Sequence, residues 1–386
     1  MSSNIAQIDD SDNGLERLSW LRLMRTPRVG PATARRLVNM FGSAAIAVLN
    51  APSLARNAGG VLRIPSLREA QIELERCHKF GAKMLILTDN AYPRAFQDLP
   101  DMPPIITVKG DPKLLNMRQI AIVGARHASA GGMSLATRFA DELGRAGFVT
   151  TSGLAKGIDI AAHKGALKHG TIAVIAGGID NVYPKEHLSW YERIGSEGLI
   201  ISEQPFGCTP TAKLFPKRNR LIAALSQAVV VVEAAERSGT LITVRFALDY
   251  GREILAIPGS PLDSRSYGTN ALIRQGATLV TCADDMLEVL LRNAINEPTI
   301  TNSNSSTPTT TKIMHPIDSD GSRNRARQAL LRHLSYTPCA FAELYELLDG
   351  DTQELAVLLI ELELAGLIQR SADNKISLAP LSETGL

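Results

Sequence analysis

The feature that most limits the possible folds is an alternation of short apolar runs with helical segments, which starts near Lys83 and continues to about residue 281. Segment 118–129 shows the unit clearly, because an apolar run over 120–123 ends at Gly124 and leads into a segment with apolar residues at helical spacing. Such runs are typical of strands buried on both faces of a parallel sheet. The pattern predicts strands over 84–88, 105–110, 120–124, 148–151, 171–177, 199–203, 228–234, 253–259 and 278–281.

This alternation predicts an α/β fold built on an extended Rossmann-like, doubly wound and mostly parallel sheet. In such sheets the ligand binds beyond the carboxyl ends of the strands. The predicted turn after Gly124 lies at a helix N-terminus, where backbone N–H groups and the helix dipole favour an anion. Because Arg126 adds a positive charge at the same turn, we interpret Gly124 and Arg126 as phosphate-binding residues.

A dinucleotide is not the predicted ligand of this turn. The G-x-G-x-x-G sequence is absent, because Arg126 occupies the position of the second glycine. The next predicted strand, 148–151, is followed by Ser152 and Gly153, without an acidic residue that could bind a ribose hydroxyl. NAD and FAD are therefore excluded, and no cofactor is predicted.

Length and composition set the class of protein. With 386 residues and 45% hydrophobic content, the chain is long enough for two or three domains. Residues 1–14 are polar and acidic, unlike a secretory signal, and the longest apolar run, 221–235, is interrupted by polar residues. We therefore expect a cytoplasmic protein that does not enter a membrane. The four cysteines form no C-x-x-C pair, so no metal site is predicted.

Residues 14–66 form a basic segment with eight arginines and one acidic residue, Glu16. Gly30-Pro31 and the residues after it resemble the second half of a helix-hairpin-helix, a small module that grips nucleic-acid backbone. The first glycine of that hairpin is replaced by Arg28, so its loop cannot be assumed to offer backbone amides to phosphate. Residues 1–80 are thus predicted to be a small all-α domain, either a packing domain with a solvated arginine face or a DNA contact.

Polar segments follow several further strands. Asp159 and His163 lie four residues apart on one predicted helix face, either as an acid/base set or, more commonly, as a structural helix pair. Lys185 comes from a loop beyond a strand, where it is either a solvated lysine or a phosphate contact. A helix start that again suits a phosphate is formed by Ser238, Gly239 and Thr240.

Residues 213–220 carry a second strong anion signal. Pro216 predicts the start of a helix whose first turn is crowded with cations, and cations at the positive end of a helix dipole invite an anion. A phenylalanine ring among basic residues suits a single nucleic-acid strand, because the charges bind the backbone and the ring stacks on a base. The alternative is that the ring belongs to the core. The residues are Lys213, Phe215, Lys217, Arg218 and Arg220.

The last part of the chain divides into a linker and a small domain. Residues 296–322 are rich in Ser, Thr, Asn and Pro, which predicts a flexible linker after a Rossmann domain over 81–295. Helices over 325–334, 341–348 and 352–365, followed by a short hairpin, predict a winged-helix domain over 323–386. Its third helix carries Glu354, Glu361 and Glu363, so we expect a protein-interaction or dimer-modulating role rather than groove reading.

Six motifs in this order resemble the DNA-processing protein A family (DprA, also called Smf): IVGAR, TSGLAKGIDIAAH, VYPKEH, FPKRNRLIA, VVEAAERSGTLIT and IPGS. The resemblance spans about residues 15–290, and the N-terminal helices and winged-helix tail also match forms of the family. It implies a protein of natural transformation that binds and protects incoming single-stranded DNA in a basic pocket of the Rossmann domain, forms a homodimer, helps to load RecA and is not an enzyme. By matching position, it assigns the G-x-R arginine to Arg126 and the YPK lysine to Lys185.

The strongest competing class is the nucleotide phosphoribohydrolases of the lysine-decarboxylase-like group. These enzymes share a Rossmann sheet and a Gly-Gly-x-Gly-Thr-x-x-Glu phosphate turn. In this chain the glutamate position is Thr243 and the first Gly-Gly pair is missing, so no acid/base group for glycosidic cleavage is evident. A third class is a purely structural or scaffolding protein. The density of cations argues against this class.

Overall fold

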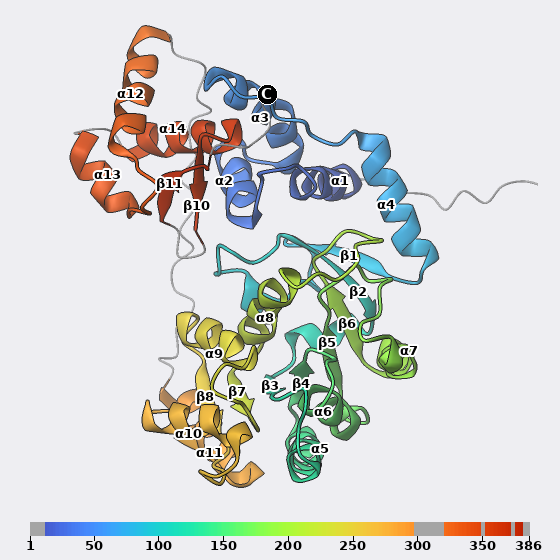
Figure 1. Ribbon diagram of the computed structural model, residues 1–386. Helices are drawn as coiled ribbons and strands as arrows, with labels where there is room; N and C mark the ends of the chain where they lie inside the picture. Colours follow the sequence, from blue (N-terminus) through green and yellow to red (C-terminus); the bar gives the residue numbers. More distant parts are fainter. Residues whose placement is uncertain (1–11, 297–319, 349–351, 372–374, 381–386) are drawn as a thin grey trace, which may run out of the picture. The chain divides into compact units, whose positions relative to one another are not determined.

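The computed structural model describes residues 12–296, 320–348, 352–371 and 375–380 (Figure 1). The chain divides into two compact units, one from Ile72–Ser303 and one from Met1–Gln71 together with Asn304–Leu386. We call these the Rossmann unit and the terminal unit, and α4 (Leu67–Lys79) contains the boundary between them. The predicted linker 296–322 lies almost wholly outside the described residues. The predicted boundaries 1–80, 81–295 and 323–386 stay predictions.

The Rossmann unit is built on one sheet of nine strands, which confirms the predicted α/β class. Neighbouring strands follow the order β1-β2-β6-β5-β4-β3-β7-β8-β9. The seven from β6 to β9 pair in parallel, whereas β2 pairs with β6 and β1 pairs with β2 in antiparallel register. The strands are β1 (Lys83–Ile86), β2 (Ile105–Gly110), β3 (Gln119–Val123), β4 (Val149–Ser152), β5 (Thr171–Val174), β6 (Leu199–Ser202), β7 (Ala228–Val231), β8 (Glu253–Ala256) and β9 (Thr278–Leu279).

Several strands end earlier than predicted. The predicted strand 171–177 ends at Val174, and the predicted strand 253–259 ends at Ala256. Ile175 and Ile257 nevertheless remain buried beyond these ends. Their N–H groups donate to the carbonyl oxygens of Ile201 and Val231 at 2.9 and 3.0 Å, so hydrogen bonding and burial both continue one residue past each strand end.

Helices cover both faces of the sheet. Along β3, Ile120 and Ile122 pack on one face and Ala121 and Val123 on the other, because successive side chains of a strand alternate. The first face is covered by α5 (Ala130–Arg145), α6 (Ile158–Ala166) and α11 (Ala283–Asn296). The second face is covered by α8 (Leu214–Leu225), α9 (Thr240–Asp249) and α10 (Tyr267–Arg274).

Short elements complete the Rossmann unit. The helix α7 (Leu188–Glu197) packs on the β2 and β6 side of the sheet. It is preceded by the 3-10 turn η3 (Lys185–His187). The other 3-10 turns are η1 (Arg94–Phe96), η2 (Pro112–Asn116) and η4 (Ser264–Ser266).

The terminal unit contains the N-terminal helices and the predicted winged helix. The first part consists of α1 (Asp12–Met24), α2 (Pro31–Phe41) and α3 (Ala44–Asn57). The second part confirms the three predicted helices and the hairpin, as α12 (Asp320–His333), α13 (Phe341–Leu348), α14 (Thr352–Ala365), β10 (Ile368–Arg370) and β11 (Ile376–Leu378). Among the described residues, no single helix is long and apolar enough to span a membrane, although α2 and α3, bent by 102°, meet that criterion as a pair.

Arg28 takes a glycine-like conformation in the hairpin between α1 and α2. Its φ angle is 71°, in the left-handed region that few residues other than glycine adopt. The loop therefore keeps the backbone path that the missing glycine would allow. Its guanidinium donates to the carbonyl oxygen of Val61, a contact that holds the strained residue in place.

The acidic residues of α14 do not form the exposed face that the sequence suggested. Arg327 donates two hydrogen bonds to the buried Glu361 carboxylate, at 2.9 and 2.7 Å. Glu363 accepts a hydrogen bond from the Thr33 hydroxyl at 2.8 Å and pairs with Arg36 at 3.4 Å. Only Glu354 of the three is exposed. The Glu361 and Glu363 carboxylates therefore bind other residues of the terminal unit. The prediction that they repel phosphate is wrong, because both are buried.

Candidate nucleic-acid interface

The switch point of the sheet lies between β3 and β7, because β3 pairs with β4 on one side and with β7 on the other. Ligands of open α/β sheets bind at this point, beyond the carboxyl ends of the strands. Gly124 follows β3 here and is buried. A Cβ atom at Gly124 would lie 2.5 Å from Ile158 Cγ1 and 3.0 Å from the carbonyl oxygen of Glu233. The glycine is therefore required for close packing of α6 against the end of β3.

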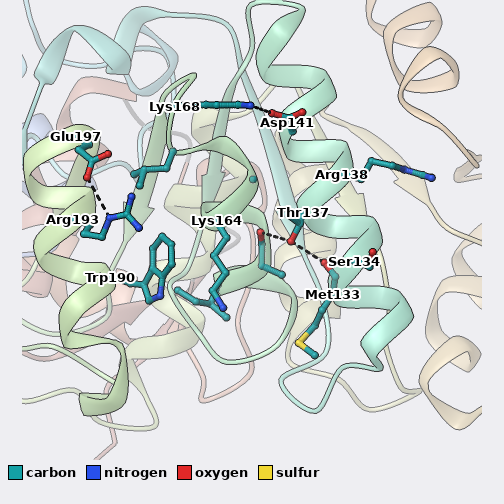
Figure 2. Close-up of a pocket in the computed structure, with 14 residues that line it drawn as sticks. Met133, Ser134, Thr137, Arg138, Asp141, Lys164, Lys168, Trp190, Arg193 and Glu197 are labelled. Atoms are coloured by element: carbon teal, nitrogen blue, oxygen red, sulfur yellow. Dashed lines mark hydrogen bonds and ion pairs between the residues drawn. The ribbon is translucent and has the colours of Figure 1, made fainter.

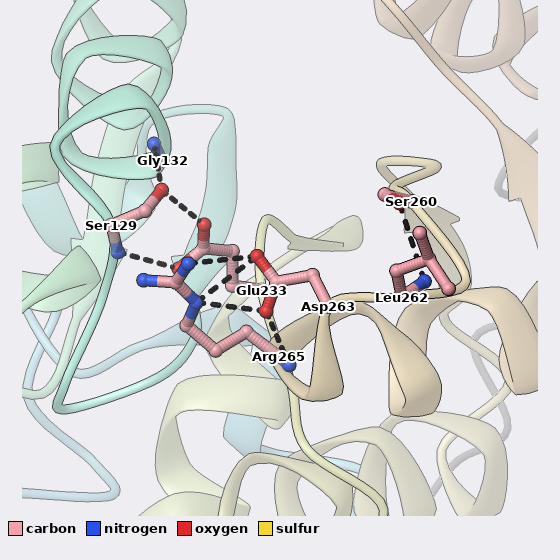
Figure 3. Close-up of polar contacts among 7 residues, drawn as sticks. All are labelled: Ser129, Gly132, Glu233, Ser260, Leu262, Asp263 and Arg265. Atoms are coloured by element: carbon pink, nitrogen blue, oxygen red, sulfur yellow. Dashed lines mark hydrogen bonds and ion pairs between the residues drawn. The ribbon is translucent and has the colours of Figure 1, made fainter.

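The N-terminus of α5 holds a carboxylate from the protein itself. The backbone N–H of Ser129 donates to Glu233 Oε2 at 2.9 Å, and the Ser129 hydroxyl donates to the other carboxylate oxygen (Figure 3). Ser129 Oγ also accepts from the N–H of Gly132 at 2.8 Å. Arg265, which is paired with Asp263, lies beside the same carboxylate (Figure 3). This helix end thus carries an internal anion where the sequence predicted a phosphate.

Arg126 lies beside an aromatic pair. Its guanidinium carbon is 5.1 Å from the centroid of the Phe215 ring, and the rings of Phe215 and Tyr183 meet edge to face at 5.4 Å. Arg126 and Tyr183 are exposed, whereas Phe215 is half-buried and belongs to neither core cluster of the Rossmann unit. The three side chains come from the loop after β3, the loop before η3 and the first turn of α8. They form an exposed surface with a cation beside two rings.

Three lysines extend the positive charge around these rings. Lys185 begins η3, while Lys213 and Lys217 flank the first turn of α8, and all three are exposed. Within the described residues, neither these lysines nor Arg126 form an ion pair with a carboxylate. The helix starts at Leu214, two residues before the predicted Pro216. We call Arg126, Tyr183, Lys185, Lys213, Phe215 and Lys217 the aromatic–cation surface.

Arg218 is buried beneath this surface, although the sequence suggested a phosphate contact. A Cβ atom at Gly153 would lie 1.5 Å from Arg218 Nη1 and 2.7 Å from Asp159 Oδ2, so the guanidinium and the carboxylate both lie over Gly153, which leaves room for them. Burial lowers the pKa of Arg218 to about 10, partly offset by attraction to Asp159. Burial raises the pKa of Asp159, against the attraction of Arg218 and a hydrogen bond from the N–H of Ala155.

The predicted acid/base pair of α6 is not a catalytic set. His163 is fully buried, and its Nδ1 lies 2.7 Å from Thr171 Oγ1, which donates to the carbonyl oxygen of Thr150. His163 Nδ1 must therefore donate, which leaves Nε2 as a buried acceptor without a partner among the described residues. Burial, followed by repulsion from Arg218 and His187, lowers the pKa of His163 to about 3. The imidazole is neutral and structural, in agreement with the alternative interpretation of the pair.

Arg220 is also committed within the protein. Its guanidinium pairs with Glu203 and donates to the carbonyl oxygen of Asp101 at 2.7 Å, and its side chain is 11% exposed. These contacts tie α8 to the end of β6 and to the segment before β2. The structure thus leaves Lys213, Phe215 and Lys217 of this motif at the surface and directs Arg218 and Arg220 inward.

The Ser238-Gly239-Thr240 turn uses its polar groups internally. Thr240 Oγ1 donates to the carbonyl oxygen of Gly124 at 3.0 Å, and Ser238 Oγ accepts from the Thr240 N–H at 3.2 Å. The carbonyl oxygen of Gly239 accepts from Asn219 Nδ2 at 3.3 Å. This turn therefore links α8 and α9 to the end of β3, and the Ser238 and Thr240 side chains are used within the protein.

Tyr183 and Glu233 were not predicted as site residues from the sequence. Tyr183 is 50% exposed and precedes Lys185 by two residues in the same motif. An aromatic ring so close to a lysine in the sequence could have indicated a nucleic-acid contact. Glu233 had no such signal, because it reaches Ser129 across 104 residues of sequence. Within the described ranges, no three His, Cys, Asp or Glu side chains gather as a possible metal site.

Comparison with known proteins identifies the family. The family sequence model described as DNA recombination-mediator protein A matches residues 83–291, more than half of the chain. The chain belongs to this family. The models of the DprA-like N-terminal HHH domain and of the DprA winged helix domain match residues 15–76 and 316–374. The resemblance to the DprA/Smf family, including its terminal domains, is thereby confirmed.

Relatives of the DNA recombination-mediator protein A family match in sequence and structure. DNA processing protein DprA of Bacillus subtilis is 39% identical over 213 residues, which cover 54% of this chain and 72% of the relative. The solved structure of DprA from Streptococcus pneumoniae matches with a TM-score of 0.59 and 34% identity, over 71% of this chain and 96% of that chain. DNA processing protein A from Helicobacter pylori, described for its single-stranded DNA binding mode, matches with a TM-score of 0.50 and 32% identity, over 54% and 96% of the two chains.

Proposed function

We propose that this protein binds single-stranded DNA across the aromatic–cation surface, in the service of DNA processing. The observation that carries the proposal is a set of exposed cations without a carboxylate partner among the described residues: Arg126, Lys185, Lys213 and Lys217. Arg126 lies against the ring of Phe215, and Lys213 and Lys217 each lie two residues from Phe215 in the chain. Unpaired cations bind backbone phosphates, and an accessible ring stacks on a base of any sequence. The single-stranded DNA binding described for the Helicobacter pylori relative supports the choice of ligand.

Arg218 and Arg220 act in this proposal as positioning residues. Both side chains point into the protein from α8. Arg218 lies near Asp159, and Arg220 pairs with Glu203. They hold the first turn of the helix, and so present Phe215 and its flanking lysines, without contacting DNA.

The finer roles are proposed on the family resemblance. They are natural transformation, protection of the incoming strand, loading of RecA, a homodimeric state and the absence of enzymatic activity. Thr243, in place of the hydrolase glutamate, is buried inside α9, which supports binding without catalysis. Release of free base from nucleoside monophosphates, abolished by substitution of Arg126, would favour the phosphoribohydrolase alternative.

Arg126→Ala and Lys185→Ala are each expected to weaken binding of single-stranded DNA to a similar extent for all sequences, because both side chains would contact phosphate. The slope of log K against log salt should fall by roughly 0.7 for each phosphate that is no longer neutralised. Fluorescence anisotropy of labelled oligonucleotides over a salt series measures both quantities. Arg292→Ala is the matched control, since Arg292 is an exposed arginine of α11 far from this surface in the sequence. An unchanged slope and affinity in both variants would remove these residues from the site.

Phe215→Ala is expected to weaken binding about 5- to 150-fold with the salt slope preserved, because one stacked base contributes typically ~1–3 kcal/mol. The melting temperature should change little, since the ring is half-buried and lies outside both core clusters. Phe215→Trp should bind as well as the wild type. A large fall in melting temperature in both variants would instead assign Phe215 to the core.

A further inference from the structure

A hollow of the Rossmann unit lies between α5, α6 and α7, formed by residues outside the aromatic–cation surface. Figure 2 shows the side chains that line it. Its volume is about 900 Å³. Its floor is formed where α5 and α6 touch: Thr137 Oγ1 donates to the carbonyl oxygen of Ala161 at 3.0 Å, and a Cβ atom at Gly165 would lie 2.0 Å from the carbonyl oxygen of Thr137. The floor is thus closely packed. We call this hollow the α5–α6–α7 groove.

The walls of the groove combine positive charge with an aromatic ring. Four cationic side chains, Arg138, Lys164, Lys168 and Arg193, line it against two acidic ones, Asp141 and Glu197. Trp190 projects from α7 between two of the cations, with Lys164 Nζ 5.6 Å and Arg193 Cζ 4.7 Å from its ring (Figure 2). Three of these cations are paired, Arg138 with Glu142, Lys168 with Asp141 and Arg193 with Glu197. Lys164 has no carboxylate partner in the described part of the chain, so its charge is available to a ligand.

The groove is connected to the aromatic–cation surface through its own helices. Lys185 lies in η3, which leads directly into α7, so Trp190 follows it by about one and a half helical turns. Lys156, just before α6, pairs with Glu186 of η3 at 2.7 Å and so joins the starts of the two helices that wall the groove. A strand held at Lys185 would therefore follow α7 to reach Trp190, Arg193 and Lys164.

We propose that the α5–α6–α7 groove is a second contact site for the same single DNA strand, where Trp190 stacks on a base and Lys164 and Arg193 hold flanking phosphates. The inference rests on the proposed function, because it extends the strand from the aromatic–cation surface into the groove. Cations around a ring match a nucleic-acid backbone and base together, whereas an acidic protein segment would use only the charges. The groove thus lengthens the binding site and raises the affinity for longer strands.

The chain contains only two tryptophans, Trp20 and Trp190, which makes the proposal directly measurable. In the full-length Trp20→Phe variant, all tryptophan fluorescence comes from Trp190. Oligothymidylates of about 6 and about 20 nucleotides bracket the site sizes that are common for single-strand binding. We expect the long strand to quench Trp190 and the short strand to bind at the aromatic–cation surface without quenching. If the Trp20→Phe variant folds poorly, the difference in fluorescence quenching between the wild type and Trp190→Phe gives the contribution of Trp190.

Charge reversal supplies the matched comparison. Arg193→Glu and Arg292→Glu each reverse an exposed arginine that pairs with a glutamate four residues away, but only Arg193 lines the groove. Arg193→Glu should weaken binding of the long strand and lower its salt slope by at least roughly 0.7, with the short strand unaffected. Trp190→Ala should weaken binding of the long strand about 5-fold or more. Arg292→Glu should change neither.

The possible failures are distinguishable. If neither strand binds, the proposed function itself fails. If both strands bind but the long one neither quenches Trp190 nor binds more weakly to Arg193→Glu, the groove is not part of the DNA path. Equal quenching by polyglutamate would show a surface for acidic proteins and overturn the assignment to nucleic acid.

Discussion

Replacing Asp159 by alanine is expected to lower the free energy of unfolding of the Rossmann unit by about 3–5 kcal/mol, because it leaves the buried Arg218 guanidinium without its compensating charge. Two buried opposite charges that attract each other need not be a strong net stabiliser, since burial opposes both charges. Removing one partner alone is nevertheless costly, because the remaining charge stays out of water. The effect should therefore exceed that of most single substitutions.

Denaturant titration of the Trp20→Phe protein measures this quantity, because Trp190 then reports on the Rossmann unit alone. The double variant Asp159→Asn, Arg218→Met removes both charges at similar volume and should recover much of the stability. Glu288→Ala, which removes an exposed carboxylate paired with Arg292, is the control and should behave like the wild type. If Asp159→Ala unfolds at the wild-type denaturant concentration, the pair does not hold α8 in place.

The stability of the Rossmann unit is expected to decrease as the pH falls from about 6.5 towards about 3, in part because His163 resists protonation. Its pKa is lowered to about 3 in the folded protein, against an ordinary value of 6.5 in the unfolded chain. Between these values the unfolded chain binds one proton more than the folded protein at this site. The free energy of unfolding therefore falls with falling pH by up to about 1.4 kcal/mol per unit, or of order 4 kcal/mol in total.

Substitution by asparagine isolates the contribution of His163 from that of the carboxylates. His163→Asn keeps a donor for the Thr171 hydroxyl but cannot be protonated in this range. Its stability, measured by urea unfolding at a series of pH values, should depend less steeply on pH than that of the wild type in this window. His169→Asn is a control on a partly exposed histidine that already has a carboxylate partner, Asp141, at 3.0 Å. Parallel profiles for wild type and His163→Asn would contradict the low pKa.

The sheet was predictable because most of its strands are buried apolar runs that end in a polar turn; β9, which is not buried, is an exception. Such a run reports burial directly, as in 120–123, where both faces of the strand are covered. The same reasoning placed strand ends too late, since the strands end at Val174 and Ala256 and only the N–H groups of Ile175 and Ile257 still bond to the neighbouring strands. The winged helix followed from helix lengths and the hairpin alone.

The candidate site was predictable only as a region. Arg218 shares a helix face with Leu221, Ile222 and Leu225, all buried, so helical periodicity could have shown that it points inward. Arg220 is held by Glu203 and Asp101, and Glu363 by Thr33 and Arg36, through contacts between residues far apart in the sequence. No local sequence pattern predicts such pairings. The sequence therefore shows how many charged residues there are, but not which of them remain unpaired and able to bind a ligand.

The carboxylate of Glu233 at the N-terminus of α5 has a consequence for the choice between a free nucleotide and a polymer. A helix end with open amides encloses the terminal phosphate of a small ligand, but here Glu233 already accepts from the Ser129 amide and Arg265 lies beside it. The remaining cations, Arg126, Lys185, Lys213 and Lys217, are exposed and come from three different segments of the chain. Under the proposed function, a mononucleotide would engage one or two of these charges, whereas a chain of phosphates would engage several in series. We therefore expect a preference for long strands, because Glu233 occupies the helix end that could otherwise bind a terminal phosphate.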